Sequence, residues 1–170
     1  GSFRLVITKE SNALKDATLF NKDIGQYRYA STYEYENKLG INHEGSFLDF
    51  MDRVELLKGK TIDLLYKLKK QGKSVYGYGA STKGNTLLQY YGIDSNLIKA
   101  IAERQQQKFG TLTPGSWIPI ISEEEMREAN PDYIFVFPWH FFNEFYRREA
   151  RTLKRGSKFI VPLPELTIIE

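Results

Sequence analysis

Apolar residues in the first part of the chain predict a strand and one long helix. Residues 3–8 are rich in β-branched and aromatic side chains and predict a strand, with no hairpin partner nearby. Residues 12–42 are polar and weakly periodic, which predicts a connection with a short helix. From about Ser46 to Gln71, apolar residues recur at helical spacing and predict a long amphipathic helix that ends at Gly72.

After Gly72 the pattern alternates between strands and helices. Strands are expected at 73–78, 97–102, 118–121, 132–137 and 158–161, and helices at 83–91, 123–129 and 141–153. Ser122 and Glu125 have the spacing of a capping box at the start of the second of these helices. Such alternation implies right-handed crossovers and a parallel sheet. The predicted fold class is α/β: a Rossmann-like, mostly parallel sheet with flanking helices, preceded by a detached strand and a long amphipathic helix.

Composition and charge narrow the class of protein. The 170 residues carry a formal net charge of +3, and no long basic run occurs, so we expect no nucleic-acid partner. The absence of cysteine fits a cytoplasmic protein and excludes thiolate metal sites. With only two histidines we expect no metal site. No apolar run approaches the roughly 20 residues of a membrane span, so we expect no membrane partner.

The segment 75–88 carries the most informative chemistry. It predicts a buried strand, a glycine-rich turn and a helix, and such an arrangement binds phosphate groups in α/β sheets. Gly77 lacks a Cβ and would let a ligand approach the backbone, as would the second glycine of the turn. The expected ligand contacts come from the turn and the start of the helix: Gly79, Ala80, Ser81, Thr82, Lys83, Gly84 and Asn85.

This segment matches neither of the two common phosphate-binding motifs. A Walker loop needs its lysine after the last glycine, whereas Lys83 precedes Gly84. A dinucleotide fingerprint that starts at Gly77 would need its third glycine or alanine at Thr82, and Gly84 comes two places late. A tight turn whose glycines serve only packing is therefore the alternative interpretation.

Three further residues are expected near the same ligand. Glu103 follows the second predicted strand, where dinucleotide folds carry a ribose-binding acid, or it is a solvated glutamate at a strand end. Lys108 lies in a polar loop and could reach a phosphate or remain solvated. His140 is a candidate acid, base or hydrogen-bond donor. Its alternative role is a histidine that packs between Trp139 and Phe141.

Four motifs resemble the C-terminal domain of SAM-dependent sugar C-methyltransferases, which act on nucleotide-linked deoxysugars. They occur in the family's order: Tyr-Gly-Ala-Ser-Thr-Lys-Gly-Asn-Thr-Leu-Leu at 78–88, Lys-x-Gly at 108–110 with Pro-Gly-Ser-Trp-Ile-Pro at 114–119, Pro-Trp-His at 138–140, and Pro-Leu-Pro at 162–164. The opening Gly-Ser-Phe-Arg also resembles the tail of a His-Gly-Gly-Ser-x-Arg segment near the end of the family's SAM-binding domain. One departure is Gln105-Gln106, where relatives tend to carry Asn-Pro.

The resemblance implies a parent protein with a zinc-binding N-terminal domain, a central SAM-binding domain and this C-terminal domain. Residues 1–45 would then be a strand and a connection from the junction with the missing SAM domain. Residues 46–170 would be the Rossmann-like C-terminal domain, including the long helix. The nucleotide sugar, with dTDP as a candidate carrier, would lie between the last two domains.

The resemblance also implies a division of chemistry between the domains. In this family a base removes the proton α to a 4-keto group, and the enolate attacks the SAM methyl. The family's base candidate is a histidine in a Tyr-x-Glu-His segment of the central domain, and no such segment occurs here. The chain also lacks a SAM-binding glycine motif, so SAM would be bound by the missing domain. We expect no cofactor and no catalytic residue in this chain, with His140 the sole candidate, and no methyl transfer by the chain alone.

The sequence also leaves two other functions open. The strand, turn and helix at 75–88, together with Glu103, would also suit an NAD(P)-binding oxidoreductase domain. A protein-interaction module without a ligand is the third possibility, because 11 Phe, 11 Tyr and 2 Trp supply aromatic surface.

Overall fold

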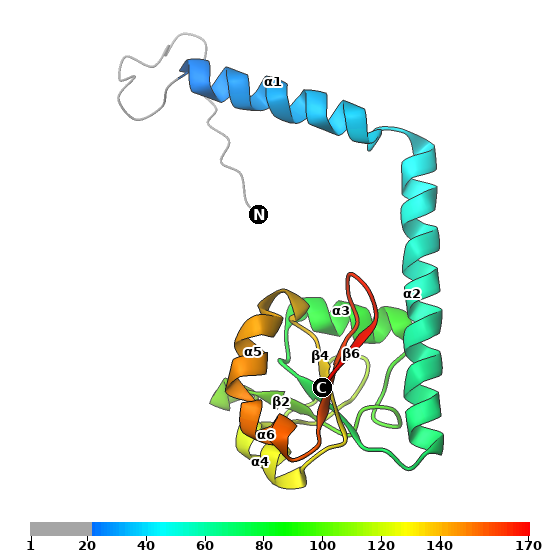
Figure 1. The fold of residues 1–170 in the computed structure, drawn as a ribbon, viewed down its shortest axis with the longest axis vertical. Coiled ribbons are helices and arrows are strands. Elements are labelled where there is room, and N and C mark those ends of the chain that lie inside the picture. The colour runs from blue at the N-terminus through cyan, green and yellow to red at the C-terminus, as the bar shows by residue number, and fades with distance from the viewer. Residues whose placement is uncertain (1–21) are drawn as a thin grey trace. The chain divides into compact units, whose positions relative to one another are not determined.

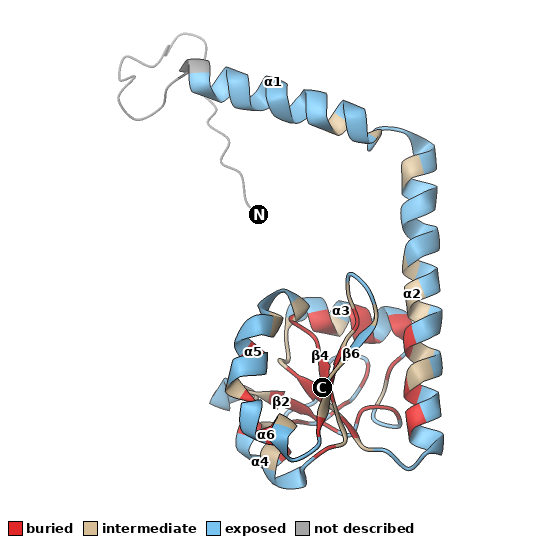
Figure 2. Ribbon diagram, in the orientation of Figure 1, coloured by how far each residue is buried: buried red, intermediate tan, exposed pale blue. Residues whose placement is uncertain are grey.

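The computed structural model describes residues 22–170, so the strand predicted at 3–8 lies outside the described residues. The chain divides into two compact units between Met51 and Asp52. In the first unit, helix α1 spans Lys22–Leu39, and the prediction of only a short helix in this region is wrong. Helix α1 is exposed along most of its length (Figure 2). Its apolar residues are not gathered on one face, and such an apolar stripe is the signal that reveals a helix in a sequence.

The long amphipathic helix is confirmed as α2, Glu44–Lys70, which begins in the first unit and ends in the second. It ends as predicted at Gly72, whose φ of +71° is readily adopted by glycine. Its last turns bury Thr61, Leu65 and Leu68 in the second unit. The apolar spacing in this half of the helix therefore reflects burial against the α/β core.

The second unit contains a six-stranded, mostly parallel sheet with helices around it, as the sequence predicted (Figure 1). The strand order is β3-β2-β1-β4-β5-β6, the order of dinucleotide-binding doubly wound folds. Five parallel strands are β1 Val75–Tyr78, β2 Ile101–Glu103, β3 Ile120–Ser122, β4 Tyr133–Val136 and β5 Lys158–Val161. Strand β6, Thr167–Ile169, pairs antiparallel with β5 and was not predicted. Its three residues, none of them buried, give too weak a pattern.

One strand begins later than its sequence pattern suggested. The stretch 97–102 was expected to be extended throughout, but β2 starts at Ile101. Leu97 and Ile98 lie in a turn in which both of their amides donate to the Asp94 carbonyl. Both side chains are nevertheless buried. The apolar run at 97–102 therefore marks residues that pack in the core, and only its last two residues belong to a strand.

Short helices connect the strands. They are α3 Thr82–Tyr91, η2 Gln106–Lys108, α4 Glu123–Ala129, η3 Trp139–Phe141, α5 Phe142–Arg148 and α6 Ala150–Lys154. Both hydrogen bonds of the predicted capping box are present: Ser122 Oγ accepts from the Glu125 amide (3.1 Å), and Glu125 Oε2 accepts from the Ser122 amide (2.8 Å). Helix α3 ends at Gly92, φ +68°, as predicted.

The core forms two layers, one on each face of the sheet. On one face, residues of α2 and α3 such as Leu65 and Leu88 pack against Ile101 and Phe137. On the other face, Met126 of α4 and Phe145 of α5 pack with Tyr78, Ile134 and Phe159. Figure 2 shows these buried positions concentrated on the strands and on the helix faces toward them.

The predicted single helix over 141–153 is wrong, because it is interrupted at Glu149 between α5 and α6. The Glu149 carboxylate is buried and accepts hydrogen bonds from Arg127 Nη2 (2.6 Å), Tyr78 Oη (2.8 Å) and Thr152 Oγ1 (2.8 Å). Burial raises the pKa of Glu149, but these contacts outweigh it and lower the pKa overall. The helix breaks where a charged side chain turns inward to reach partners on other elements.

Candidate functional site

A cavity of about 370 Å³ opens beside the loop between β1 and α3. Three segments form it: the β1–α3 loop with the first turns of α3, the segment that follows η2, and apolar residues of the sheet. The lining residues are Gly79, Ala80, Ser81, Thr82, Gly84, Asn85, Leu88, Ile101, Lys108, Thr111, Leu112, Thr113, Pro114, Ile120 and Phe137. Six of the seven residues predicted at 79–85 therefore line one cavity, together with the predicted Lys108.

The start of α3 borders this cavity: Thr82 lines it, and Lys83 is the next residue in the chain. Ser81 caps the helix: its Oγ accepts from the Gly84 amide (3.1 Å), and its carbonyl accepts from the Asn85 amide (2.9 Å). The amides of Thr82 and Lys83 then have no acceptor among residues 22–170. These amides form the positive end of the helix dipole, which favours a bound anion. The Lys83 side chain is exposed and does not line the cavity.

Lys108 contributes a fixed positive charge. Its ammonium donates to the Ala80 carbonyl (2.9 Å) and to Glu103 Oε2 (3.1 Å), and so connects the loop after β1 to the end of β2. The other Glu103 oxygen accepts from the amides of Arg104 (2.7 Å) and Gln105 (3.1 Å). Burial raises the Glu103 pKa, but these bonds outweigh it and lower the pKa. Glu103 thus stays ionised and holds Lys108, and it does not itself line the cavity.

The glycines of the motif have a packing role within the protein. A Cβ on Gly77 or on Gly84 would lie 2.6 Å from an atom of the Phe137 side chain. A Cβ on Gly79 would lie 2.5 Å from Pro138, and the φ of Gly79 is +84°. These three positions accommodate Phe137 and Pro138, which supports the alternative interpretation of the glycines as packing residues. This packing role of the glycines does not prevent a ligand from binding to the neighbouring backbone amides.

The segment after η2 contributes lining residues that were not among the predicted site residues. Thr111, Leu112, Thr113 and Pro114 line the cavity, and the Pro114 carbonyl accepts from Gln89 Nε2 of α3 (3.0 Å). A buried turn holds them in place: Thr113 Oγ1 accepts from the Ile118 amide (2.9 Å) and lies 2.7 Å from Ser116 Oγ. The sequence signal for this segment was the Pro-Gly-Ser-Trp-Ile-Pro motif that begins at Pro114.

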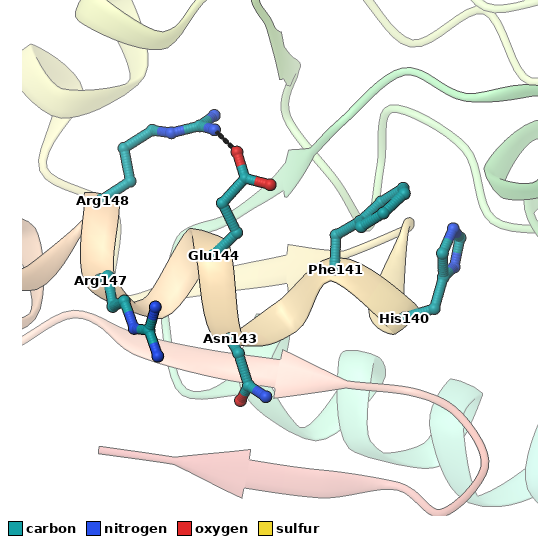
Figure 3. A pocket seen from close by; sticks show the side chains of 6 residues that line it. All are labelled: His140, Phe141, Asn143, Glu144, Arg147 and Arg148. Atoms are coloured by element: carbon teal, nitrogen blue, oxygen red, sulfur yellow. Dashed lines mark hydrogen bonds and ion pairs between the residues drawn. The ribbon is translucent and has the colours of Figure 1, made fainter.

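His140 lies apart from this cavity. It borders a broad open depression of about 570 Å³ along α5, with Phe141, Asn143, Glu144, Arg147 and Arg148. Figure 3 shows Glu144 and Arg148 on one side of α5 and Asn143 and Arg147 on the other, so these side chains do not converge on one point. The His140 ring is exposed and lies 4.3 Å from the Phe141 ring and 5.9 Å from the Trp139 ring, between centroids. This agrees with the alternative interpretation, a histidine beside two aromatic neighbours.

The part of the chain that the structure describes has neither a metal-binding cluster nor a membrane-spanning helix. No group of three or more histidine, aspartate or glutamate side chains within it is arranged to hold a metal ion. No helix between residues 22 and 170 has the length and apolar character needed to cross a membrane.

Comparison with known proteins identifies relatives of the chain. Residues 1–164 match the family described as the C-methyltransferase C-terminal domain. The chain is also 36 % identical over 134 residues to the C-methyltransferase NovU of Streptomyces niveus. That alignment covers 79 % of this chain and 32 % of NovU, so the chain spans about a third of the length of this relative.

Proposed function

The chain belongs to the C-methyltransferase C-terminal domain family, and from this we propose that it binds the substrate of a SAM-dependent sugar C-methyltransferase. The proposed substrate is an NDP-4-keto-deoxysugar, with dTDP as the candidate carrier. Methyl transfer would be the activity of the whole parent, a cytoplasmic enzyme whose SAM-binding and zinc-binding domains lie outside this chain.

The observation that carries the proposal is that the start of α3, with its two free amides, and the Lys108 cation border the same cavity. The amides of Thr82 and Lys83 lack acceptors, and the Lys108 ammonium lies 2.9 Å from the Ala80 carbonyl in the same loop. A diphosphate is doubly suited to this point, because it accepts several hydrogen bonds and carries negative charge. In this proposal the backbone from Gly79 to Gly84 and the polar side chains of Ser81, Thr82 and Asn85 contact the substrate, and Lys83 adds positive charge nearby.

SAM does not fit the same cavity. None of the residues that line it is a carboxylate, so no negative charge there balances a sulfonium cation. Lys108 also contributes a positive charge, which would repel the sulfonium. We therefore propose that SAM is bound by another domain of the parent and that the chain alone transfers no methyl group. Turnover by the purified chain with SAM and a 4-keto-sugar nucleotide would contradict this.

An NAD(P)-binding domain is the second candidate function, because dinucleotide-binding folds have the same strand order as this sheet. Such a domain would use Glu103 to accept hydrogen bonds from a ribose. Here the two Glu103 oxygens already accept from two backbone amides and from Lys108. This occupied carboxylate favours the sugar nucleotide over the dinucleotide.

An NMR titration of the isotope-labelled chain tests the two candidates directly. We expect a dTDP-sugar to shift the amide signals of residues 79–85 and 108–114, and NAD at the same concentrations to leave them unchanged. Shifts with NAD alone would favour the oxidoreductase. An absence of shifts with both ligands would contradict binding by this chain and would favour the interaction module.

A further inference from the structure

The cavity beside α3 has an apolar end that a diphosphate does not explain. Leu88, Ile101, Ile120 and Phe137 line it and are buried, and Leu112 also lines the cavity, with about half of its surface exposed. A charged group gains nothing from such a surface, because burial away from water disfavours charge. This end of the cavity suits a flat, mostly apolar ring.

One side chain that lines the cavity carries a polar atom without a hydrogen-bond partner. Asn85 Oδ1 is buried, and within residues 22–170 it is the sole buried side-chain oxygen or nitrogen without a hydrogen-bond partner. Asn85 also lines the cavity. Buried polar atoms in native proteins are almost always hydrogen-bonded, so an orphan acceptor at a cavity points to a donor that arrives with a ligand.

We propose that the apolar end holds the nucleobase of the sugar nucleotide, a uracil or thymine whose ring N–H donates to Asn85 Oδ1. This inference rests on the proposed function and assigns a part of the substrate to a part of the site. In these bases the ring N–H has carbonyl groups on both sides, and a carboxamide presents an acceptor and a donor side by side. Asn85 can therefore accept from the N–H and donate to a neighbouring carbonyl.

The positions along α3 agree with this assignment. Asn85 stands three residues after Thr82, about one helical turn further along, so the two ends of one nucleotide would contact successive turns. The phosphates would meet the free amides of Thr82 and Lys83, and the base would lie on the far side against Leu88. A volume of about 370 Å³ falls within the range of small-molecule sites, about 300–1,000 Å³.

Calorimetric titrations of the 170-residue chain test the assignment with four probes: UDP, TDP, 3-methyl-UDP and inorganic pyrophosphate. The methyl group of 3-methyl-UDP removes the ring N–H and leaves the phosphates unchanged. We expect it to bind the unmodified chain at least about tenfold more weakly than UDP, the effect of losing one buried hydrogen bond. We expect Asn85→Leu to weaken UDP and TDP to a similar extent and to leave pyrophosphate within about twofold.

Asn143→Leu supplies a matched control, because Asn143 is an exposed asparagine on α5 that does not line this cavity. We expect it to bind all four probes like the unmodified chain. Equal binding of UDP and 3-methyl-UDP, or full UDP affinity in Asn85→Leu, would overturn the base assignment while the proposed function stands. Failure of UDP, TDP and pyrophosphate to bind the unmodified chain would overturn both. The 3-methyl-UDP comparison needs no variant, so a folding defect in Asn85→Leu cannot mask the answer.

Discussion

Gly84 of α3 packs directly against Phe137, the residue after β4: a Cβ on Gly84 would lie 2.6 Å from the Phe137 Cβ. Gly77 of β1 leaves space for the same ring, and a Cβ there would lie 2.6 Å from Phe137 Cε2. The two glycines allow Phe137, which is fully buried, to approach both a strand and a helix closely. This contact sets how closely α3, and with it the amides at the cavity, lies to the sheet.

Gly84→Ala should therefore destabilise the protein by about 1–3 kcal/mol, because overpacking a core forces neighbours to move. Gly59→Ala is the control: Gly59 lies inside α2 with nothing within 4 Å of a Cβ. That change should stabilise by up to about 1 kcal/mol through helix propensity. Urea unfolding followed by circular dichroism measures both. If the two variants were equally stable, α3 would have moved away from Phe137 without a loss of stability. Gly84 would then not be required for packing.

Lys108→Met should weaken binding of a dTDP-sugar by about tenfold, the effect of removing one charge-assisted contact. The variant loses both the positive charge and the bonds to Ala80 and Glu103. Lys99→Met makes the same chemical change at an exposed lysine that does not line the cavity, and it should bind normally. Calorimetric titration of both variants checks this. An equal loss in the two would indicate a nonspecific effect of net charge.

Glu149→Ala should destabilise the protein by about 3 kcal/mol, because it removes one partner of a buried ion pair. Arg127 and Tyr78 would lose their shared acceptor between α4, α5 and β1. Glu128→Ala, at an exposed position on α4, should change the unfolding free energy by less than about 0.5 kcal/mol. Chemical unfolding of both variants gives the comparison, and a Glu149 variant as stable as the control would refute the argument.

Asp132 should make the free energy of unfolding depend on pH in the acidic range. Hydrogen bonds from Lys73 and from the Ser74 amide lower its pKa from 3.8 to about 2. Because the folded-state pKa lies below the unfolded one, the contribution is fully present above about pH 4 and is lost as pH falls toward 2. The carboxylate is partly exposed, so we expect a contribution of only about 1 kcal/mol.

Unfolding of the unmodified chain and of Asp132→Asn at pH 6 and at pH 2.5 measures this contribution. The free-energy difference between the two proteins should shrink at the lower pH, where the aspartate begins to be protonated. A difference that is the same at both pH values would show that the Asp132 charge does not contribute.

The elements that the sequence predicted well are those with strong local signals. The apolar spacing that includes Leu65 and Leu68 located α2, the pair Ser122 and Glu125 located the start of α4, and Gly92 located the end of α3. Each signal lies within a few residues of the structure that it specifies. The sequence motif at 79–85 likewise placed six residues on one cavity, because a strand, a turn and a helix are consecutive in the chain.

The tertiary structure alone decided which distant residues meet. Packing brings Lys108 to Ala80, places Phe137 between Gly77 and Gly84, and breaks a helix where Glu149 turns inward to Arg127. It also leaves His140 away from the cavity, although the sequence placed both after parallel strands. Periodicity in a sequence specifies which face of an element is apolar. The partner on that face is set by how all the elements pack together.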